Sequence, residues 1–389
     1  MRQNLAYVSL ILFLIVSVPL DAGIRPSFDV DQCSWNATHI VMVQTTPKDA
    51  VFIVVESWKG DLKRGDSVEL PDLEPNENAF AVSGYPKDRE FEDKRETSEQ
   101  IPRQPIGSRM ILFLKKQEEN GPETPVKWGP ASTWGGMKVS ALWINDGKAF
   151  CFEQWMNPGP SALSQCMRWQ VRSSDVTVFT TRIQEVLQVQ RDLAEGLELK
   201  NPDLRAHRLG RIALGDVYQA QKEAMNALAK AGTVALPEIL QVMDKPPGFY
   251  DGDALIRMLV EAAGKDSGRQ LHARLQQDVI YWENVGPTLT QDWLGQLIEV
   301  GSPLFIKFNE TSLLVRELDK EHYAPAAQTI AELRSFWISQ PQLYDPNWGE
   351  DGRNGKVRTS VTGQDIVRSY AFGLAKGCDA FLQSVGRKN

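Results

Sequence analysis

The sequence has few of the residues that most often carry chemistry in proteins. Its 389 residues include only four cysteines and four histidines. The cysteines lack CxxC spacing and have no histidine beside them, which argues against a zinc site. His39, His207, His272 and His322 are scattered, and no HExxH segment occurs. We therefore expect no metal cofactor at these residues.

Several motifs typical of enzymes and of nucleic-acid binders are also missing. No Gly-x-Ser-x-Gly segment is present, so the nucleophile elbow of a hydrolase has no support. Neither a Walker loop nor a Gly-x-Gly-x-x-Gly turn that opens a helix occurs. The net charge is −7, whereas nucleic-acid binding requires a basic surface. We expect a protein without a cofactor, without a nucleic-acid partner and without catalytic activity.

A long hydrophobic run occurs only at the N-terminus. Arg2 precedes an apolar segment from Leu5 to Leu20, and Ala22 offers a cleavage site, which together predict a secretory signal peptide over residues 1–22. A membrane anchor is the alternative, but the run of about 16 residues is shorter than the roughly 20 that span a bilayer. The sequence thus predicts a secreted or periplasmic protein with no membrane span after cleavage.

Four cysteines in an exported chain permit disulfides, and they allow three pairings. Cys151 and Cys166 flank the turn-rich segment 157–160, which suits a bridge across a hairpin or a long loop. Such a bridge would contribute on the order of 3 kcal/mol. The remaining pair, Cys33 and Cys378, would then tie the two ends of the chain together.

The length predicts two or three domains, and the first of them, over residues 28–172, has the pattern of a β-domain. Short apolar segments recur there, separated by glycine and proline: "THIVMVQTT", "AVFIVVESW", "SRMILFLKK", "KVSALWI" and "AFCFEQW". The triplet Asn145-Asp146-Gly147 indicates a hairpin. Residues 59–66 read as a solvated turn between two strands. Together these segments predict a closed barrel or a sandwich.

The same segments resemble the core of a netrin-like domain. The resemblance rests on a strand that ends in Trp58-Lys59-Gly60, on a return strand over 65–68, and on the strand over 107–114. It implies an oligonucleotide-binding-type (OB-type) β-barrel, the fold of the tissue inhibitors of metalloproteinases. Those inhibitors place a cysteine at the mature N-terminus to chelate the zinc of the protease. Here Cys33 lies inside the mature chain, so protease inhibition is only an alternative.

From residue 176 to 386 the apolar residues change to a helical period. Asn201 and Pro202 mark the start of a helix, and Gly232 marks the end of another. The segment "NALAKAGTVALPEILQVMD", with its Ala235-Leu236-Pro237 turn, is similar to HEAT-type helical repeats. An all-α domain of HEAT-like repeats is one expectation, and an irregular helical bundle is the other. The whole chain is therefore predicted as an α+β multidomain protein.

Aromatic residues on predicted loops are the candidate binding residues. Trp128 and Trp134 lie on the loop over 118–136, where the alternative role is a lid over the barrel mouth. Phe249 and Tyr250 lie on a second loop, where the alternative is packing against the flanking helices. Exposed aromatic side chains would suit contact with a protein partner.

A loop rich in oxygen ligands follows near the C-terminus. Asp345, Asn347, Glu350 and Asp351 provide carboxylate and amide oxygens, which Ca²⁺ prefers. The spacing is not that of an EF-hand, and a plain loop between helices is the alternative. Asn36 and Asn309 begin glycosylation sequons, which matter only in a eukaryotic secretory pathway.

Two functional interpretations follow from the sequence. The first is an exported, non-enzymatic scaffold that presents a β-barrel and a helical-repeat surface to a protein partner. The second is a hydrolase whose acids come from dispersed positions, with the protease-inhibitor-like module as a further alternative. The candidate carboxylates of a hydrolase are Glu56, Asp61, Asp66, Glu350 and Asp351.

Overall fold

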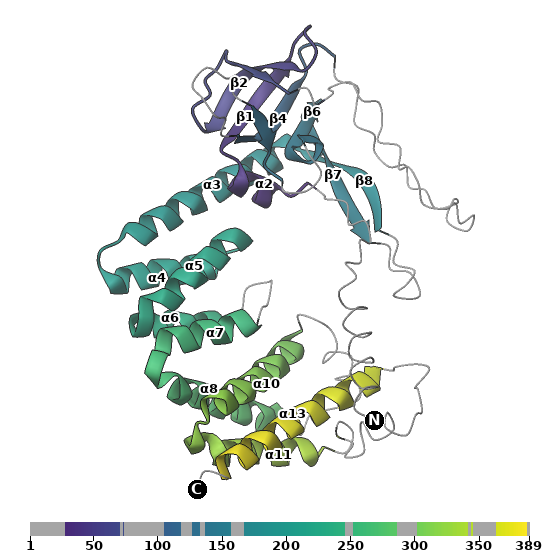
Figure 1. Ribbon diagram of the computed structural model, residues 1–389. Coiled ribbons are helices and arrows are strands. Elements are labelled where there is room, and N and C mark those ends of the chain that lie inside the picture. The colour runs from purple at the N-terminus through teal and green to yellow at the C-terminus, as the bar shows by residue number, and fades with distance from the viewer. Residues whose placement is uncertain are drawn as a thin grey trace, which may run out of the picture. The chain divides into compact units, whose positions relative to one another are not determined.

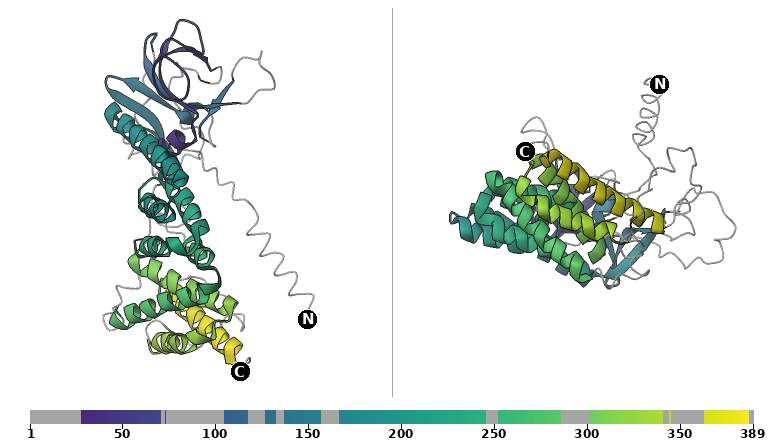
Figure 2. Two further views of the ribbon diagram at one scale, coloured as in Figure 1. Left: turned by 90° about the vertical axis from the view of Figure 1, so that its left-hand side faces the viewer. Right: turned by 90° about the horizontal axis from the view of Figure 1, so that it is seen from below.

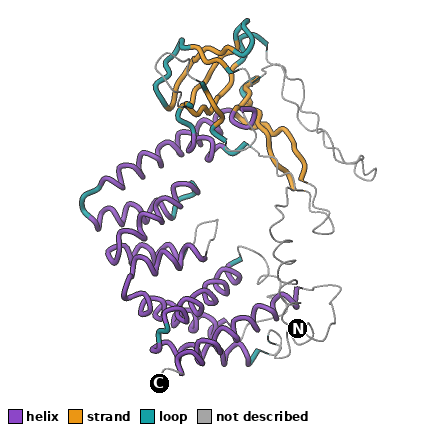
Figure 3. Tube along the Cα trace, in the orientation of Figure 1, coloured by secondary structure: helices purple, strands orange, loops and turns teal. Residues whose placement is uncertain are grey.

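The computed structural model describes residues 28–70, 73, 105–117, 127–132, 137–156, 167–245, 252–285, 302–340, 344 and 363–386 (Figure 1). The chain divides into two compact units, Met1–Gln188 and Val189–Asn389. The described strands all belong to the first unit (Figure 3). The division between the units falls inside helix α3 (Val176–Glu198), which directly follows the last strand of the first unit.

The first unit is built on one antiparallel sheet of eight described strands. Their order is β3-β2-β1-β4-β6-β7-β8, and β5 pairs with β4 beside this path. The strands are β1 (His39–Thr45), β2 (Val51–Lys59), β3 (Ser67–Glu69), β4 (Arg109–Lys116), β5 (Trp128–Pro130), β6 (Ala141–Asn145), β7 (Lys148–Met156) and β8 (Met167–Asp175).

The sheet is open, so the predicted closure into a barrel is wrong for the described strands. β3 and β8 form the two ends of the strand order and do not pair with each other. β3 has only three residues and is followed in sequence by Pro71, which has no amide hydrogen for a ladder. A strand this short offers too few backbone groups to close the sheet.

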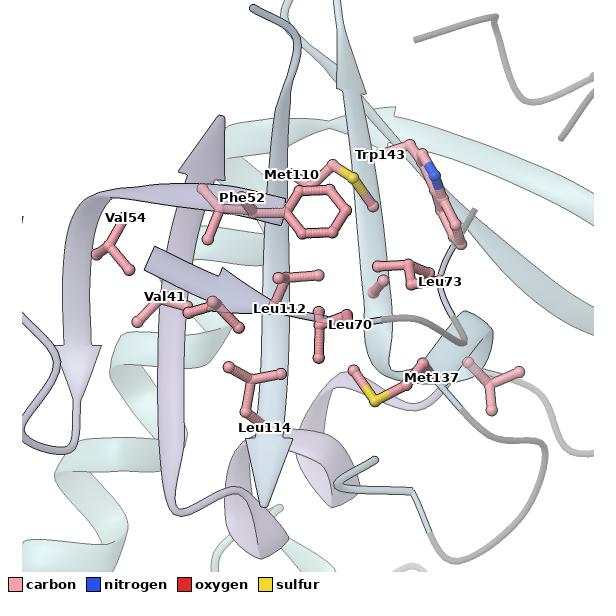
Figure 4. Packing of buried hydrophobic residues seen from close by; sticks show 14 of the residues in the cluster. Val41, Phe52, Val54, Leu70, Leu73, Met110, Leu112, Leu114, Met137 and Trp143 are labelled. Carbon is pink, nitrogen blue, oxygen red and sulfur yellow. The ribbon is translucent and has the colours of Figure 1, made fainter. Parts of the chain in front are cut away.

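Both faces of the sheet are apolar. Along β4 five consecutive residues, from Met110 to Leu114, are buried, because alternate side chains enter two different cores. Met110, Leu112 and Leu114 belong to the first core, whose members also come from β1, β2 and β6 (Figure 4). Ile111 and Phe113 belong to the second core, on the opposite face.

Helices cover the second core. Helix α2 (Val30–Asn36) begins at Asp29, whose carboxylate accepts hydrogen bonds from the amides of Asp31 and Gln32. Helix α3 contributes the buried Ile183 and Leu187. Asp31 also receives two hydrogen bonds from the guanidinium of Arg182, at 2.6 and 2.7 Å, which join α2 to α3.

Consecutive helices of the second unit pack in pairs: α4 with α5, α6 with α7, α8 with α10, and α11 with α13. Each pair also contacts the next (Figures 1 and 2). The helices are α4 (Pro202–Ala213), α5 (Tyr218–Ala231), α6 (Leu236–Asp244), α7 (Gly252–Ala263), α8 (Ser267–Val285), α10 (Pro303–Glu321), α11 (Ala327–Ile338) and α13 (Gly363–Gly386). None of the described helices is both long and apolar enough to cross a membrane.

Helices at the same place in neighbouring pairs run in the same direction. On α8 and α11, His272 bonds Thr329, and Trp282 contacts Trp337 further along both helices. On α10 and α13, Phe308 stacks on Tyr370, and Asp319 accepts a hydrogen bond from Ser384. Within the pair α8 and α10 the direction is opposite, since Arg274 pairs with Glu310 and Asp278, further along α8, pairs with Lys307, earlier along α10. The last two pairs of the unit therefore stack with like helices parallel.

The turn between pairs begins in each case with a residue of positive φ, although the ψ angles of Gly232 (−153°) and His322 (+41°) differ. Helices α5, α7 and α10 each end at a residue with positive φ, namely Gly232 (+73°), Gly264 (+55°) and His322 (+51°). A short 3₁₀ turn follows in each case and leads into α6, α8 or α11. Glycine adopts this conformation at no steric cost, whereas His322 does not.

We predict that the substitution His322→Gly stabilises the chain by up to about 1 kcal/mol, because it relieves the positive φ of a residue with a Cβ atom. The capping hydrogen bonds from the amides of His322 and Tyr323 use backbone atoms and are retained. Gly264→Ala should destabilise the chain by a similar amount. Urea unfolding of the full chain measures both changes, and a destabilising His322→Gly would contradict this account of the turn.

Candidate functional site

Most of the site residues predicted from sequence lie outside the described residues. These are Trp134, Phe249, Tyr250, Cys166 and the proposed calcium ligands Asp345, Asn347, Glu350 and Asp351. The calcium site and these aromatic contacts therefore stay predictions. Within the described part of the chain, no three His, Cys, Asp or Glu side chains are grouped so as to hold a metal ion.

Trp128, the remaining predicted aromatic, lies at the start of β5 and is half-buried against the first core. Its ring meets the imidazole of His39 edge-on, with centroids 4.7 Å apart. The side chain thus packs on the sheet, and its role as a binding platform remains untested.

His39 is the centre of a polar cluster at one end of β1. The side chain is only 6% exposed, and both ring nitrogens have partners. Nε2 lies 2.6 Å from the carboxylate of Asp61, and Nδ1 lies 2.9 Å from the hydroxyl of Thr38. The hydrogen bond from His39 lowers the pKa of Asp61, as does the positive charge of the imidazolium. Asp61 is therefore ionised, and the proton of the pair belongs on Nε2.

The chain of hydrogen bonds Asp61–His39–Thr38 has the groups of a hydrolytic triad, but its hydroxyl is not available as a nucleophile. The Thr38 oxygen accepts a hydrogen bond from the amide of Lys116 at 2.7 Å and lies 3.2 Å from the carbonyl of Leu114. It therefore joins β1 to β4. A nucleophile must present a free lone pair to its substrate, so this geometry favours a structural role.

The other acids of this region do not face one another. Glu56 accepts a hydrogen bond from the indole of Trp58 at 2.7 Å, and Asp66 accepts one from the amide of Lys63 at 2.7 Å. General acid–base catalysis needs carboxylates that converge on one substrate position. Instead, Glu56 binds a side chain of its own strand, β2, and Asp66 stabilises the turn between β2 and β3.

Lys59 is the last residue of β2 and joins this strand to α2. Its ammonium donates to the carbonyls of Ser34 and Trp35, the last turn of that helix, at 3.0 and 3.3 Å. A cation at the C-terminal end of a helix is favourable. Burial lowers the pKa of Lys59 to about 8.

The cysteines show no disulfide among the described residues. Cys33 and Cys378 are buried free thiols, so the predicted tie between them is absent. Cys151 pairs with Arg172 in the ladder, while Met167, the residue after Cys166, pairs with Met156. A bridge from Cys151 to Cys166 would compete with this register, and it stays a prediction because Cys166 is not described.

A second polar cluster joins α8 to α10 inside the helical unit. Asp278 is fully buried and receives hydrogen bonds from Lys307 at 2.9 Å and from Thr311 at 2.8 Å. Glu310 lies 2.7 Å from the same ammonium and 2.5 Å from Arg274, which also pairs with Asp244. The Thr311 hydroxyl accepts from the indole of Trp282, so every named group in this network has a partner.

The charges of this network shift one another's pKa values. Burial raises the pKa of Asp278 to about 6, and the neighbouring Glu310 carboxylate adds to the rise against the attraction of Lys307. Burial alone would lower the pKa of Lys307, but its two carboxylate partners outweigh that effect and raise it. One ammonium is thus shared by two acids.

The sequence carried a signal for this network that the pattern reading missed. Asp278 falls within the apolar stripe formed by Leu271, Leu275 and Trp282 of α8, where a solvated acid does not belong. A charged residue in such a stripe predicts a buried partner on the neighbouring helix. Only the pairing of α8 with α10 identifies that partner as Lys307.

A groove of about 470 Å³ lies between α10 and α13. Phe305, Phe308, Val315, Tyr370 and Leu374 supply its apolar lining. Small residues of α13 also border it, among them Gly373, Gly377 and Ala380. A concave site of this volume and composition is in the range of ligand-binding clefts.

The glycines of the groove have no structural reason to be glycine. Neither has a positive φ, and a Cβ atom at Gly373 would meet no described atom within 4 Å. At Gly377 the nearest atom would be Cγ1 of Val315, at 3.7 Å, an ordinary contact. Glycine inside a helix is about 1 kcal/mol less favourable than alanine. The absence of a side chain at Gly373 leaves space in the groove.

We predict that Gly60→Ala destabilises the chain far more than Gly65→Ala. Both glycines have nearly the same positive φ, +92° and +95°. A Cβ atom at Gly60 would clash with the ring of His39, whereas one at Gly65 meets no atom within 4 Å. Gly65→Ala should lose about 1 kcal/mol, and Gly60→Ala roughly 2 kcal/mol more.

Denaturant unfolding of the two variants checks this prediction. Adding His39→Ala to Gly60→Ala removes the ring and should recover most of the additional loss. Equal losses for the two single variants would mean that the imidazole does not pack against the Gly60 backbone.

We predict that the stability of the chain falls as the pH rises from about 4 to about 6. The pKa of Asp278 is higher in the folded chain than its ordinary 3.8, so the folded state binds a proton more tightly. That stabilisation is present below pH 3.8 and is lost as the pH passes 6. A rise in pKa of this size corresponds to roughly 3 kcal/mol in the free energy of unfolding.

The comparison of Asp278→Asn with the wild type isolates this contribution. Between pH 4 and pH 7 the unfolding temperature of Asp278→Asn should fall less than that of the wild type. Asp266→Asn, at a residue whose side chain is 45% exposed, should follow the wild type. Identical pH profiles for Asp278→Asn and the wild type would show that Asp278 is ionised throughout this range.

The helical unit therefore combines a saturated polar network with a groove that nothing described fills, and the sheet unit adds a polar cluster engaged with its own backbone. Function has to be argued from these features alone. No family model matches the chain, and no curated protein or solved structure matches it.

Proposed function

We propose that this chain is an exported, non-enzymatic binding protein that contacts a protein partner through the groove between α10 and α13. The observation that carries the proposal is Gly373. This residue keeps the groove open, although alanine would favour the helix and would fit the available space. Selection for a binding surface accounts for such a residue, whereas packing does not.

The polar clusters support a non-enzymatic role. In the sheet unit, the hydroxyl of Thr38 serves the backbone of β4. In the helical unit, Asp278 and Lys307 satisfy each other and are largely shielded from solvent. Side chains whose hydrogen-bonding atoms are already paired in this way cannot also bind a substrate.

The proposal also includes the finer fold assignments. The sheet unit is proposed as an open-sheet variant of the netrin-like, OB-type domain, on the strand that ends in Trp58-Lys59-Gly60 and the glycine-rich turn that follows. The helical unit is proposed as a HEAT-like solenoid, since its helices pack in consecutive pairs that contact one another and the turns between pairs begin with a positive φ at Gly232, Gly264 and His322. Solenoids of this kind commonly bind other proteins.

The substitution Gly373→Leu tests the role of the groove. Leucine there fills the space between α10 and α13 without a clash, and it should leave the unfolding temperature equal or higher. The matched control is Gly386→Leu, on the same helix and also without a neighbour within 4 Å, but outside the groove. Partner capture by the full chain from the exported fraction is the measurement.

The wild type and Gly386→Leu should recover the same protein, and Gly373→Leu should recover at least tenfold less of it. Recovery of the same proteins in equal amounts by all three chains would rule out the groove as the contact site.

A further inference from the structure

One long edge of the sheet has no described strand beside it. β8 is the last strand of the order and pairs only with β7, over nine consecutive residue pairs without a register shift. Proteins usually protect a sheet edge with a short strand, a proline or a bulge. The opposite edge, β3, has only three residues and is followed closely by Pro71. β8 has none of these features, so its edge is open to a further strand.

The ladder between β7 and β8 determines which backbone groups point to the open edge. The amide of Val176 donates to the carbonyl of Gly147 at 2.9 Å, and this pair continues the register of the two strands. Bonded and non-bonded pairs alternate along an antiparallel ladder, so the even-numbered residues of β8 bond to β7. The amides and carbonyls of its odd-numbered residues, from Met167 to Asp175, therefore point outward.

The far part of this hairpin is a ribbon of only two described strands (Figure 1). β6 pairs with β7 at residues 148–150 and no further, so beyond Phe150 the listed partners of β7 all lie on β8. A two-stranded ribbon is only marginally stable in water, and a third strand is usually needed. The group that stabilises this edge must be an extended polypeptide, because only a strand offers amides and carbonyls at the matching spacing.

A second copy of the chain meets this requirement with its own β8. A twofold axis perpendicular to the sheet pairs the two copies of the strand antiparallel. Outward-pointing groups occur at every second residue, so the axis must pass through a residue and not between two. An axis at Val171 pairs the whole strand, with Met167 opposite Asp175 of the second copy.

Charge distinguishes this register from its neighbours. Arg168 and Arg172 are the basic residues of β8, and like charges directly opposite each other destabilise a strand pair. An axis at Gln170 would place Arg168 opposite Arg172, and an axis at Arg172 would place that residue opposite itself. An axis at Val171 avoids both contacts, because it places glutamine and serine opposite the two arginines.

We propose that two copies of the chain associate through β8, antiparallel about a twofold axis at Val171, so that their sheets become one continuous sheet. About ten hydrogen bonds join the two strands, since each outward-pointing pair of residues exchanges two. The contact is small for a protein dimer, so its formation depends on protein concentration. This inference is independent of the proposed function, because the groove belongs to the other unit.

Sedimentation equilibrium of the full chain, from about 1 to about 100 µM, tests the proposal in the range where small interfaces associate. Val171→Pro removes an outward-pointing amide hydrogen and retains the bonds to β7. The matched control is Glu69→Pro on β3. Its amide also points away from the sheet, because the neighbouring Leu70 donates to the carbonyl of Ala50.

The wild type and Glu69→Pro should form dimers with the same Kd, and the Kd of Val171→Pro should be at least tenfold higher. A wild type that stays monomeric throughout this range, or a dimer that Val171→Pro does not weaken, would overturn the proposal.

Cysteine variants test the register without a proline. With the axis at Val171, the two copies of this residue have Cα atoms about 5.5 Å apart, which a disulfide can join. The two copies of Ser173 lie about 14 Å apart, because each is four residues from its counterpart along the strand. Under mild oxidation, Val171→Cys should give at least tenfold more cross-linked dimer than Ser173→Cys or the wild type. Equal yields from the two variants would show that the strands do not pair in this register.

Discussion

Burial of β1 and β4 on both faces is the constraint on which the first unit depends. Residues that alternate along these strands enter two separate cores, so neither face is left to water. On one face, side chains of the strands pack with one another and with Leu70 and Leu73. Helices α2 and α3 cover the other, and the Asp31–Arg182 pair holds these two helices together. An open sheet therefore remains compatible with a fully apolar central strand.

In both units the polar clusters described above are satisfied by the chain itself, although single atoms such as Ser34 Oγ and Trp337 Nε1 are buried without a hydrogen-bond partner among the described residues. His39 bonds to Thr38 and Asp61 at the sheet, and Asp278 bonds to Lys307 and Thr311 between two helices. An unsatisfied group at either place would destabilise the fold by several kcal/mol. If the proposed function holds, recognition depends on the shape of the surface, and the groove between α10 and α13 is the described feature that provides it.

Much of the secondary structure could be predicted from sequence because its signals are local. The apolar runs predicted β1, β2, β4, β6 and β7, and the hairpin at Asp146 and Gly147 is confirmed by their positive φ angles. Asn201 caps α4 as expected. Asp216 does not cap α5, which begins after Val217 without a side-chain cap. There the packing of the helix pair decides the boundary.

The functional features depend on contacts between residues that are distant in sequence, and no local pattern reveals them. His39 meets the Gly60 turn only once β1 and β2 pair. The open sheet follows from the shortness of β3, which a stretch of alternating residues does not disclose. The groove depends on the absence of a side chain at Gly373. A single glycine in a helical segment carries no such information until the structure shows that α10 lies beside it. Sequence reasoning therefore placed the candidate site on the loops.

Each unit encloses a thiol that water does not reach. Cys33 lies on the buried side of α2 in the first unit and Cys378 lies in α13 in the second, and burial raises the pKa of each to about 12. Almost no thiolate is present at neutral pH, so neither sulfur reacts with oxidants or alkylating reagents while its unit is closed. The rate at which Cys33 or Cys378 becomes modified therefore reports how often the unit that contains it opens, so labelling of these two residues would compare the lifetimes of the two units.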